Sequence, residues 1–522
     1  MDKIHESGSQ EETANSERVD LDDVAARWTR RGLLTGMTGV AASSAAKAQG
    51  PVPFNGPATR VRRDDLYYLV NRGSFGYTPE LYAEGETRGY AGWLDWQLNP
   101  DAIADADVDM ILAGFPTLTM SCAELFAGYG PNGTIGQNFD VQRALTLARL
   151  ERAVKSSRQL YERVVDFWAD HFNVPHNENA LRLFRTVYDR EVIREHALGY
   201  FPDILMASAK SAAMLMYLNG NENVASAPNE NYAREVMELH TLGVNGGYNE
   251  NDIQELARCF TGWSFYPQNM SIFGEFRFDS ANHDYGSKVV LGQTIPSGGD
   301  VSDGEFMLNY LALHPTTAEY VSRELAVFLL DYDPPQALVD EAKAVFLATG
   351  GHMKEVVRVI MDEKWIPMVD PWNTPKLSRP MHFVCSVLRT PGLTVSTMNG
   401  VTVALEVLGH YPFQWSSPDG FPDDLDTWGS TVLPRWEFAF LVFNGSMPGV
   451  LAPAGALFNA LGGPNPADLV ERIAGHLAGG HIDLDELRVV NDFVQSGVSG
   501  TGATPMRNAL ALVACCPSYQ YL

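Results

Sequence analysis

The sequence predicts a mainly α-helical protein: a large multi-helix domain with a small β-hairpin insertion around residues 263–295. Apolar residues recur at helical spacing along most of the chain, and 45% of the residues are apolar, enough for a substantial core. A period-two alternation, Phe276-Arg277-Phe278, stands between turn residues inside the proposed insertion. A clear helical stripe is the set Leu160, Val164, Trp168 and His171.

The first 48 residues predict an export signal. Arg30 and Arg31 form a twin-arginine core, a mildly apolar run follows over residues 32–46, and Ala46-Lys47-Ala48 offers a cleavage site. The acidic residues 1–23 before it are polar and are expected to be disordered. We therefore expect the twin-arginine export machinery as a partner and a periplasmic or extracellular location. Because this route carries folded proteins, often with a cofactor inserted, it raises the expectation of a cofactor.

Charge excludes several classes of partner. The net charge of −26 and the pI near 4.8 argue against binding to nucleic acid or to an anionic membrane surface.

The run over residues 32–46 is too short and too weakly apolar for a stable membrane span. Five cysteines in a chain of this length do not make a disulfide framework.

Residues 49–522 show neither repeats nor a low-complexity linker, so they predict one elaborated helical domain. Two helical lobes, about 49–262 and 296–522, are the alternative. In either case the stretch 229–263 lies at the centre, and it holds the densest set of reactive side chains.

That stretch predicts a helix starting near Asn229, whose side chain can cap the first turn. Tyr232, Val236 and Leu239 recur on an apolar face. The neighbouring face carries Asn231, Glu235 and Glu238, with Arg234 four residues before Glu238 and His240 close to the helix end.

Paired acids with a nearby histidine can perform general acid/base catalysis or hold a metal. The candidate catalytic residues are therefore Glu235, Glu238, His240 and Arg234. Together with His171 at the end of the apolar stripe, the two glutamates and His240 are also candidate ligands for a divalent Mn, Fe, Zn or Cu ion. The alternative is an Arg–Glu ion-pair network without catalysis.

A second polar group lies in the β insertion. His283, Asp284 and Lys288 sit on a loop, where a rigid scaffold often presents functional residues. We expect them to close the site, with Asn229 and Asn231 helping to bind substrate. An ordinary hairpin turn is the alternative.

Familiar catalytic motifs are missing from the sequence. It contains no GxGxxG after a strand, no P-loop, no HExxH, no GxSxG and no CxxCH. Covalently bound haem, Walker-type nucleotide hydrolysis and α/β-hydrolase chemistry are therefore not expected.

Several segments in order resemble one bacterial family. NENYAREVMELHTLGVNGGY followed by ELARCFTGW resembles the central signature of domain of unknown function 1800 (DUF1800). The same order continues through LVNRGSFGYTP, FWADHFNV, REHALGYFPDILMASAKSAAMLMYL, FDSANHDYGSKVVLG and LGHYPFQWSSPDGFPDDLDTW. The resemblance implies an exported, largely helical protein, often encoded beside a sulfatase-like family, and brings no established activity. The C-terminal ACCPSYQ departs from the family's Ser-Pro-Glu-Phe-Gln-like ending.

Two functional hypotheses follow. The first is an exported enzyme, metal-dependent or acid/base, with a His/Glu site in the helical core. The second is a non-catalytic exported scaffold that binds another secreted protein or a polysaccharide. In the second, the Glu and Arg side chains fix helix register, and Trp415 and Trp428 present a contact surface.

Overall fold

The structure is a computed structural model that describes residues 64–176, 180–368, 376–453, 455–463, 468–496 and 503–522. All of them belong to one compact unit, Val52–Leu522. The predicted export signal, including Arg30 and Arg31, lies outside the described residues.

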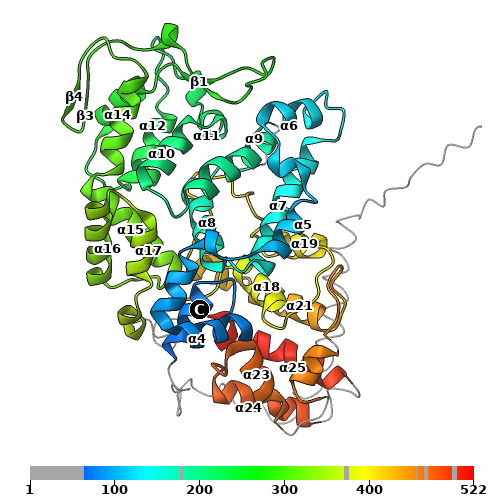
Figure 1. Cartoon of the computed structure of the whole chain (residues 1–522). Helices are drawn as coiled ribbons and strands as arrows, with labels where there is room; N and C mark the ends of the chain where they lie inside the picture. Colours follow the sequence, from blue (N-terminus) through cyan, green and yellow to red (C-terminus); the bar gives the residue numbers. More distant parts are fainter. Residues whose placement is uncertain (1–63, 177–179, 369–375, 454, 464–467, 497–502) are drawn as a thin grey trace, which may run out of the picture. The chain divides into compact units, whose positions relative to one another are not determined.

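The described chain is mainly helical, as the sequence predicts (Figure 1). The first half contains these helices, with 3₁₀ and π segments written as η: α3 (Asp65–Arg72), α4 (Pro79–Gln97), η2 (Pro100–Ala102), α5 (Ala106–Leu112), η3 (Pro116–Thr119), α6 (Cys122–Tyr129), α7 (Asn138–Lys155), α8 (Gln159–His171), α9 (Leu181–Tyr188), η4 (Asp189–Arg194), α10 (Phe201–Lys210), α11 (Ala212–Tyr217), η5 (Gly220–Glu222), α12 (Asn231–Glu235), η6 (Val236–Thr241) and α13 (Glu250–Cys259).

The β insertion contains one short helical segment, η7 (Ser280–Asn282), and the chain after it is again helical. The segments after the insertion are α14 (Val301–Ala312), α15 (Pro315–Leu329), α16 (Gln336–Thr349), α17 (Met353–Ile360), η8 (Glu363–Met368), α18 (Pro380–Arg389), α19 (Asn399–Val407), α20 (Leu425–Gly429), α21 (Val432–Phe443), α22 (Ala456–Ala460), α23 (Leu469–Ala478), α24 (Leu484–Gln495), α25 (Thr504–Cys515) and α26 (Pro517–Gln520).

The predicted β insertion is present and consists of two antiparallel hairpins. β1 (Trp263–Phe265) pairs with β2 (Phe276–Phe278), and β3 (Lys288–Val290) pairs with β4 (Gln293–Ile295). The β3–β4 turn places Leu291 and Gly292 at positive φ, 49° and 75°, as a two-residue primed turn requires. Leucine is unusual there, and its backbone N–H donates to the Asp252 carboxylate at 2.7 Å.

The helical stripe of α8 lies in the core. Leu160, Val164 and Trp168 are fully buried and His171 is buried, as its spacing predicts. The indole of Trp168 donates to the carbonyl of Ala197 at 2.9 Å, so this large side chain keeps its hydrogen bond in the interior.

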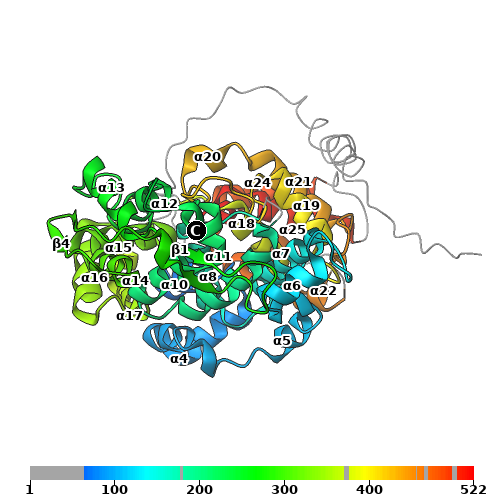
Figure 2. The same cartoon turned by 90° about the horizontal axis from the view of Figure 1, so that it is seen from above.

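The opposite side of α8 carries charge into the interior. Asp166 pairs with Arg149 of α7 and lies 3.6 Å from Arg163, while Asp170 lies 2.5 Å from Arg379, directly before α18. Burial acts to raise the pKa of Asp166, and the three arginines around it lower it further than burial raises it. These ion pairs tie α7, α8 and α18 together, and Figure 2 shows α7, α18 and α19 on one side of the molecule.

Helix starts near the candidate site follow from capping residues. Asn249 begins α13 by accepting hydrogen bonds from Asn251 and Asp252, and Asp252 bonds back to Asn249 in a capping box. The preceding helix begins at Asn231 and not at Asn229; the Asn229 side chain accepts from the Asn231 N–H at 2.9 Å. Among the described helices, none combines the length and the apolar content needed to cross a membrane.

Candidate functional site: an acidic cluster on a π-helix

The predicted central helix changes from α to π at Val236. The Leu242 N–H donates to the carbonyl of Met237 at 3.0 Å, five residues back, and the Thr241 hydroxyl donates to the carbonyl of Val236 at 2.5 Å. A π-turn holds more residues than an α-turn. The residues that face the core therefore lie further toward the C-terminus than an α-helical period would place them. Consequently His240 and Thr241 are buried, while Leu239, expected on the apolar face, is only half-buried.

His240 is packed among rings and away from the two glutamates. Its ring centroid lies 5.1 Å from that of Phe172 and 6.1 Å from that of His171. Neither of its ring nitrogens has a hydrogen-bond partner in the described part of the chain. Burial, followed by the neighbouring His171, lowers the pKa of His240 to about 3. The imidazole is therefore neutral over the physiological range and acts as a core side chain.

Glu235 and Glu238 occupy the outer side of this segment, one turn apart and both half-buried. Arg234 lies 3.5 Å from Glu238 and also pairs with Glu230 at 3.3 Å and with Glu250 of α13 at 2.7 Å. Part of the predicted Arg–Glu network is thus present, and it joins α12 to α13.

Glu235 differs from its neighbours because no ion pair is formed by its carboxylate among the described residues. Burial raises its pKa above the ordinary value; the Glu238 charge adds to this, Arg234 opposes it, and Asp419 contributes a smaller increase. Two carboxyl groups on one helical segment therefore sit in different electrostatic environments. A pair of carboxyl groups in unlike environments is an arrangement that acid/base sites use.

Helix α15 packs against η6 and completes the cluster. Glu324 accepts from Nδ1 of His171 at 2.8 Å, and the Tyr320 hydroxyl bonds to the same carboxylate. The other ring nitrogen of His171 lies 3.2 Å from the carbonyl of His240. Tyr320 packs so closely on Gly243 that an added Cβ would come within 2.9 Å of its ring. Buried His171 is thus linked through Glu324 to half-buried Tyr320.

Two further side chains lie beside the glutamates. Burial raises the pKa of Tyr248 to about 12, and the charges of Glu238 and Glu235 add to the increase. Asp419, on the loop before α20, accepts from the Trp415 indole at 3.0 Å and raises the pKa values of both Glu235 and Tyr320. We call Glu235, Glu238, Tyr248, Tyr320, Glu324 and Asp419 the acidic cluster.

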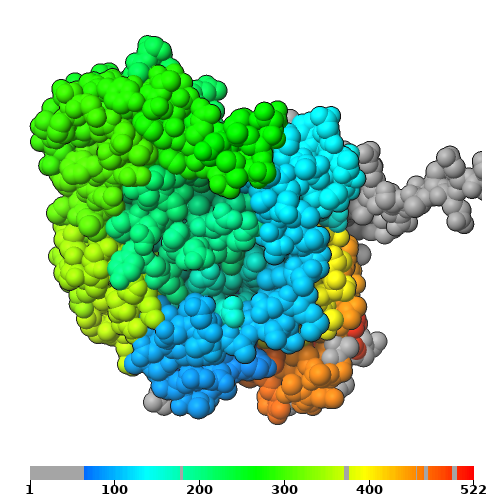
Figure 3. All heavy atoms as spheres, turned by 45° about the horizontal axis from the view of Figure 1, so that its top comes forward, coloured from blue at the N-terminus to red at the C-terminus, as the bar shows by residue number. Residues whose placement is uncertain are grey.

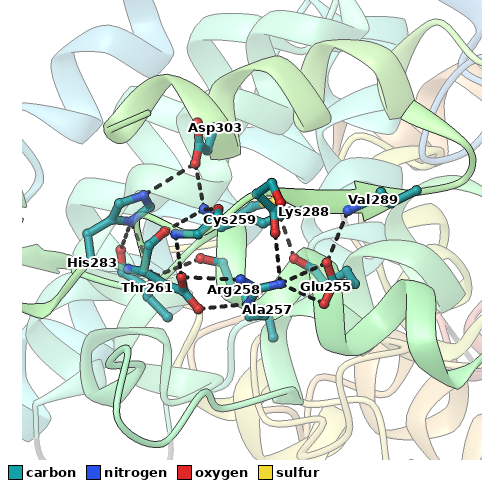
Figure 4. Close-up of polar contacts among 12 residues, drawn as sticks. Glu255, Ala257, Arg258, Cys259, Thr261, His283, Lys288, Val289 and Asp303 are labelled. Atoms are coloured by element: carbon teal, nitrogen blue, oxygen red, sulfur yellow. Dashed lines mark hydrogen bonds and ion pairs between the residues drawn. The ribbon is translucent and has the colours of Figure 1, made fainter. Parts of the chain in front are cut away.

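The hairpin residues form a separate group, shown in Figure 4. The fully buried Lys288 ammonium donates to Asp303 of α14 at 2.7 Å and to the carbonyls of Gly286 and Asp284. His283 lies 3.3 Å from the same Asp303 carboxylate and 2.8 Å from the carbonyl of Thr261. Their partners fasten the hairpin to α13 and α14, and the described contacts do not bring them to Glu235.

Asp284 is equally engaged. Arg258 of α13 donates to its two carboxylate oxygens at 2.7 and 3.2 Å, and holds Glu255 with its remaining nitrogen at 2.8 Å. The hydrogen bonds from Arg258 are the main reason that the pKa of Asp284 is lowered to about 2. Asp284 is thus a charged structural anchor in this fold.

The two asparagines predicted to bind substrate shape the chain before the cluster. The Asn229 backbone N–H donates to Asn223, whose own side chain donates to the carbonyl of Ala257 at 2.8 Å. Asn231 starts α12 and is half-buried. Buried Asn223 thus connects the loop to α13, a role that the sequence analysis missed because nothing in its local pattern distinguishes it.

The predicted metal ligands do not converge. His171 bonds to Glu324, His240 faces aromatic rings, and Glu235 and Glu238 lie on the outer side of the segment. Over the described ranges, the structure gathers no group of three or more His, Cys, Asp or Glu side chains suited to hold a metal ion.

The family model for "Protein of unknown function (DUF1800)" matches residues 68–521, nearly all of the described chain. The chain belongs to the DUF1800 family. No curated protein and no solved structure matches it. The matched range includes α12, η6 and α13, and it therefore contains this π-helix and the paired glutamates.

Proposed function

We propose that this DUF1800 protein is an exported enzyme that uses general acid/base catalysis at the acidic cluster. The observation that carries the proposal is Glu235: a half-buried carboxyl with a raised pKa, without an ion-pair partner among the described residues, one turn from a second carboxylate. A carboxyl group whose pKa moves toward the working pH is a better proton donor and acceptor.

Each residue has a distinct role in this proposal. Glu235 exchanges the proton with substrate. Glu238 is held by its ion pair with Arg234, and Tyr320 of α15, hydrogen-bonded to Glu324, offers a hydroxyl. Half-burial leaves the cluster accessible from solvent while strengthening its electrostatic interactions.

The test begins with chromogenic glycosides, esters and phosphate esters of p-nitrophenol, offered to the purified mature protein. Glu235→Gln is expected to lower the turnover of an accepted substrate by a factor of about 100 to 10,000, the usual contribution of general acid/base catalysis. Glu230→Gln is the matched control, because Glu230 also neighbours Arg234 on the preceding turn. Full activity in Glu235→Gln contradicts the proposal.

A second measurement needs no substrate. The infrared carboxyl band that is lost in Glu235→Gln should titrate above the usual range of glutamate. A band that titrates at or below that range would remove the main support for catalysis by Glu235, whatever the outcome of the substrate screen.

The metal-dependent form of the hypothesis is separable from the acid/base form. Metal analysis of the folded protein, compared with the Glu235→Gln, Glu238→Gln double variant, decides between them. A stoichiometric divalent metal in the wild type that is lost in the variant favours the metal enzyme. The acid/base proposal expects the metal content of the two proteins to be equal.

Export rests on the N-terminal sequence. We expect Arg30→Lys, Arg31→Lys to leave the precursor inside the cell, and we expect the exported protein to begin near Gln49. Precursor processing that is unchanged in this variant contradicts export by the twin-arginine route.

The second candidate function, a non-catalytic exported scaffold, has one observation in its favour. Arg234 joins Glu230, Glu238 and Glu250 in a network that links α12 to α13 without involving Glu235. Trp428, expected at a contact surface, does not support it: that side chain is 3% exposed, and its indole donates to the carbonyl of Pro422. Unchanged binding of a co-exported partner in Glu235→Gln, without turnover of any substrate, would favour the scaffold.

A further inference from the structure

A cavity of about 320 Å³ lies beside η4, the other π-helix of the protein's described part, away from the acidic cluster. Its walls come from α5, η3, α7, α9 and η4, and Leu112, Leu118 and Leu145 form the apolar part of the lining. On the face seen in Figure 3, teal residues that follow α8 in the sequence lie beside the cyan segment that contains α6 and α7. The volume is within the range of small-molecule sites.

Two of the three arginines that line the cavity are fully engaged. Arg194 donates to both carboxylate oxygens of Glu162 at 3.0 Å and to Asp189 at 2.8 Å. Arg190 donates to the carbonyls of Leu118 and Met120 and to Glu191. These two cations hold the walls together and are not available to a ligand.

Three other residues of the lining have a buried polar atom without a partner in the part of the chain that the structure describes. Nη1 of Arg152, Oγ1 of Thr186 and Oδ1 of Asp189 are buried and form no hydrogen bond within the described part of the chain. Thr186 and Asp189 are only 1% and 3% exposed. A buried polar atom without a partner costs about 1–3 kcal/mol, so three around one cavity indicate that something else satisfies them.

The three atoms differ in hydrogen-bonding character. Arg152 offers a cationic donor, Asp189 offers a carboxylate acceptor, and the Thr186 hydroxyl offers both. A bound anion alone would leave Asp189 unsatisfied, and a bound cation alone would leave Arg152 unsatisfied. The complementary ligand therefore carries a carboxylate together with a hydroxyl donor, on a carbon frame short enough to lie against the leucines.

We propose that this cavity binds a small hydroxycarboxylate, with its carboxylate on Arg152 and its hydroxyl on Asp189 and Thr186. The ligand needs no metal and no covalent step. This site is independent of the acidic cluster, so loss of ligand binding at the cavity and loss of catalysis at Glu235 are separate outcomes.

The test is isothermal titration calorimetry on the full chain with three probes of similar size. L-Tartrate has carboxylates and hydroxyls, succinate lacks the hydroxyls, and erythritol lacks the carboxylates. We expect tartrate to bind at one site, succinate to bind at least about 10-fold more weakly, and erythritol to give no binding heat, because hydrogen bonds to charged groups carry the affinity.

Two variants assign the binding to this cavity. Arg152→Gln should weaken tartrate about 10- to 100-fold, and Thr186→Val, which keeps the side-chain shape, should weaken it severalfold. The matched control is Arg88→Gln, a surface arginine that pairs with Glu84 on α4. The proposal is overturned if the wild type binds no tartrate, if erythritol binds equally well, or if tartrate affinity is unchanged in the variants. If Arg152→Gln does not fold, Thr186→Val alone decides.

Discussion

Nδ1 of His171 lies 2.8 Å from a carboxylate oxygen of Glu324, across 153 positions of sequence. The contact joins the end of α8 to α15, and α15 in turn packs on η6. It therefore fixes one wall of the acidic cluster relative to the segment that carries Glu235 and Glu238. The His171 side chain is 2% exposed and the Glu324 side chain 34%, so the pair lies at the boundary between core and solvent.

Removing this contact should have a measurable but moderate cost. Glu324→Gln is expected to lower the free energy of unfolding by about 1 kcal/mol, because the partly exposed carboxylate loses a charged hydrogen bond to a buried ring. Glu319→Gln on the same helix, where the carboxylate pairs with Lys343, is the control and should cost less than about 0.5 kcal/mol. Urea unfolding of both variants measures the difference. Equal stability of the two variants would contradict a specific role for the His171 contact.

Breaking the buried ion pair between Lys288 and Asp303 should lower the free energy of unfolding far more. Lys288→Met leaves the Asp303 carboxylate buried without its ammonium partner, and breaking such a pair typically costs about 3–5 kcal/mol. The Lys288→Met, Asp303→Leu double variant removes both charges and should recover part of that loss. Urea unfolding measures both variants. Lys343→Met, at a more exposed ion pair, should cost less than about 1 kcal/mol and serves as the control. A single variant as stable as this control would show that the anchor contributes little.

Features that depend on local spacing could be predicted from the sequence. The burial of Leu160, Val164 and Trp168 follows from their period along α8, and the β insertion follows from the alternation at Phe276–Phe278. His171 was expected to end this apolar stripe, and it does so.

Features that depend on contacts between residues far apart in the chain could not be predicted from the sequence. A π-turn needs hydrogen bonds five residues apart, which residue types alone do not specify. The α-helical period therefore predicts an inward Leu239, whereas the structure buries His240. The four-residue spacing of Tyr320 and Glu324 on one helix face was a visible signal for a shared role. Their approach to His171 depends on the packing of α15, which no local pattern encodes.

Neutral burial of His240 predicts a dependence of stability on pH. The pKa of His240 falls from an ordinary 6.5 to about 3 in the folded state. At pH values between these two, the unfolded chain binds a proton at His240 that the folded chain does not bind. The stability contribution is fully present above about pH 6.5 and is lost as the pH falls toward 3. His240→Leu should remove up to one proton from this linkage, a slope of about 1.4 kcal/mol per pH unit.

Urea unfolding at intervals between pH 4 and 8 measures the two slopes. Above pH 7 the stability difference between wild type and His240→Leu should be constant, which provides an internal control. Parallel curves throughout would show that His240 is protonated equally in both states, and would reopen a chemical role for its ring.

Glu235 has the opposite linkage, since its pKa is raised in the folded protein. Between the unfolded and folded pKa values the folded state binds the extra proton, so Glu235 makes the protein less stable as the pH rises through that window. Glu235→Gln should therefore melt at a higher temperature than the wild type at pH 7, and the difference should shrink as the pH falls below the ordinary glutamate range. Glu230→Gln, which loses an attractive contact with Arg234, should not raise the melting temperature. A carboxylate that destabilises the fold at neutral pH is retained for a reason other than stability, as expected of a catalytic group. Equal or lower stability of Glu235→Gln at pH 7 would place Glu235 among the structural charges.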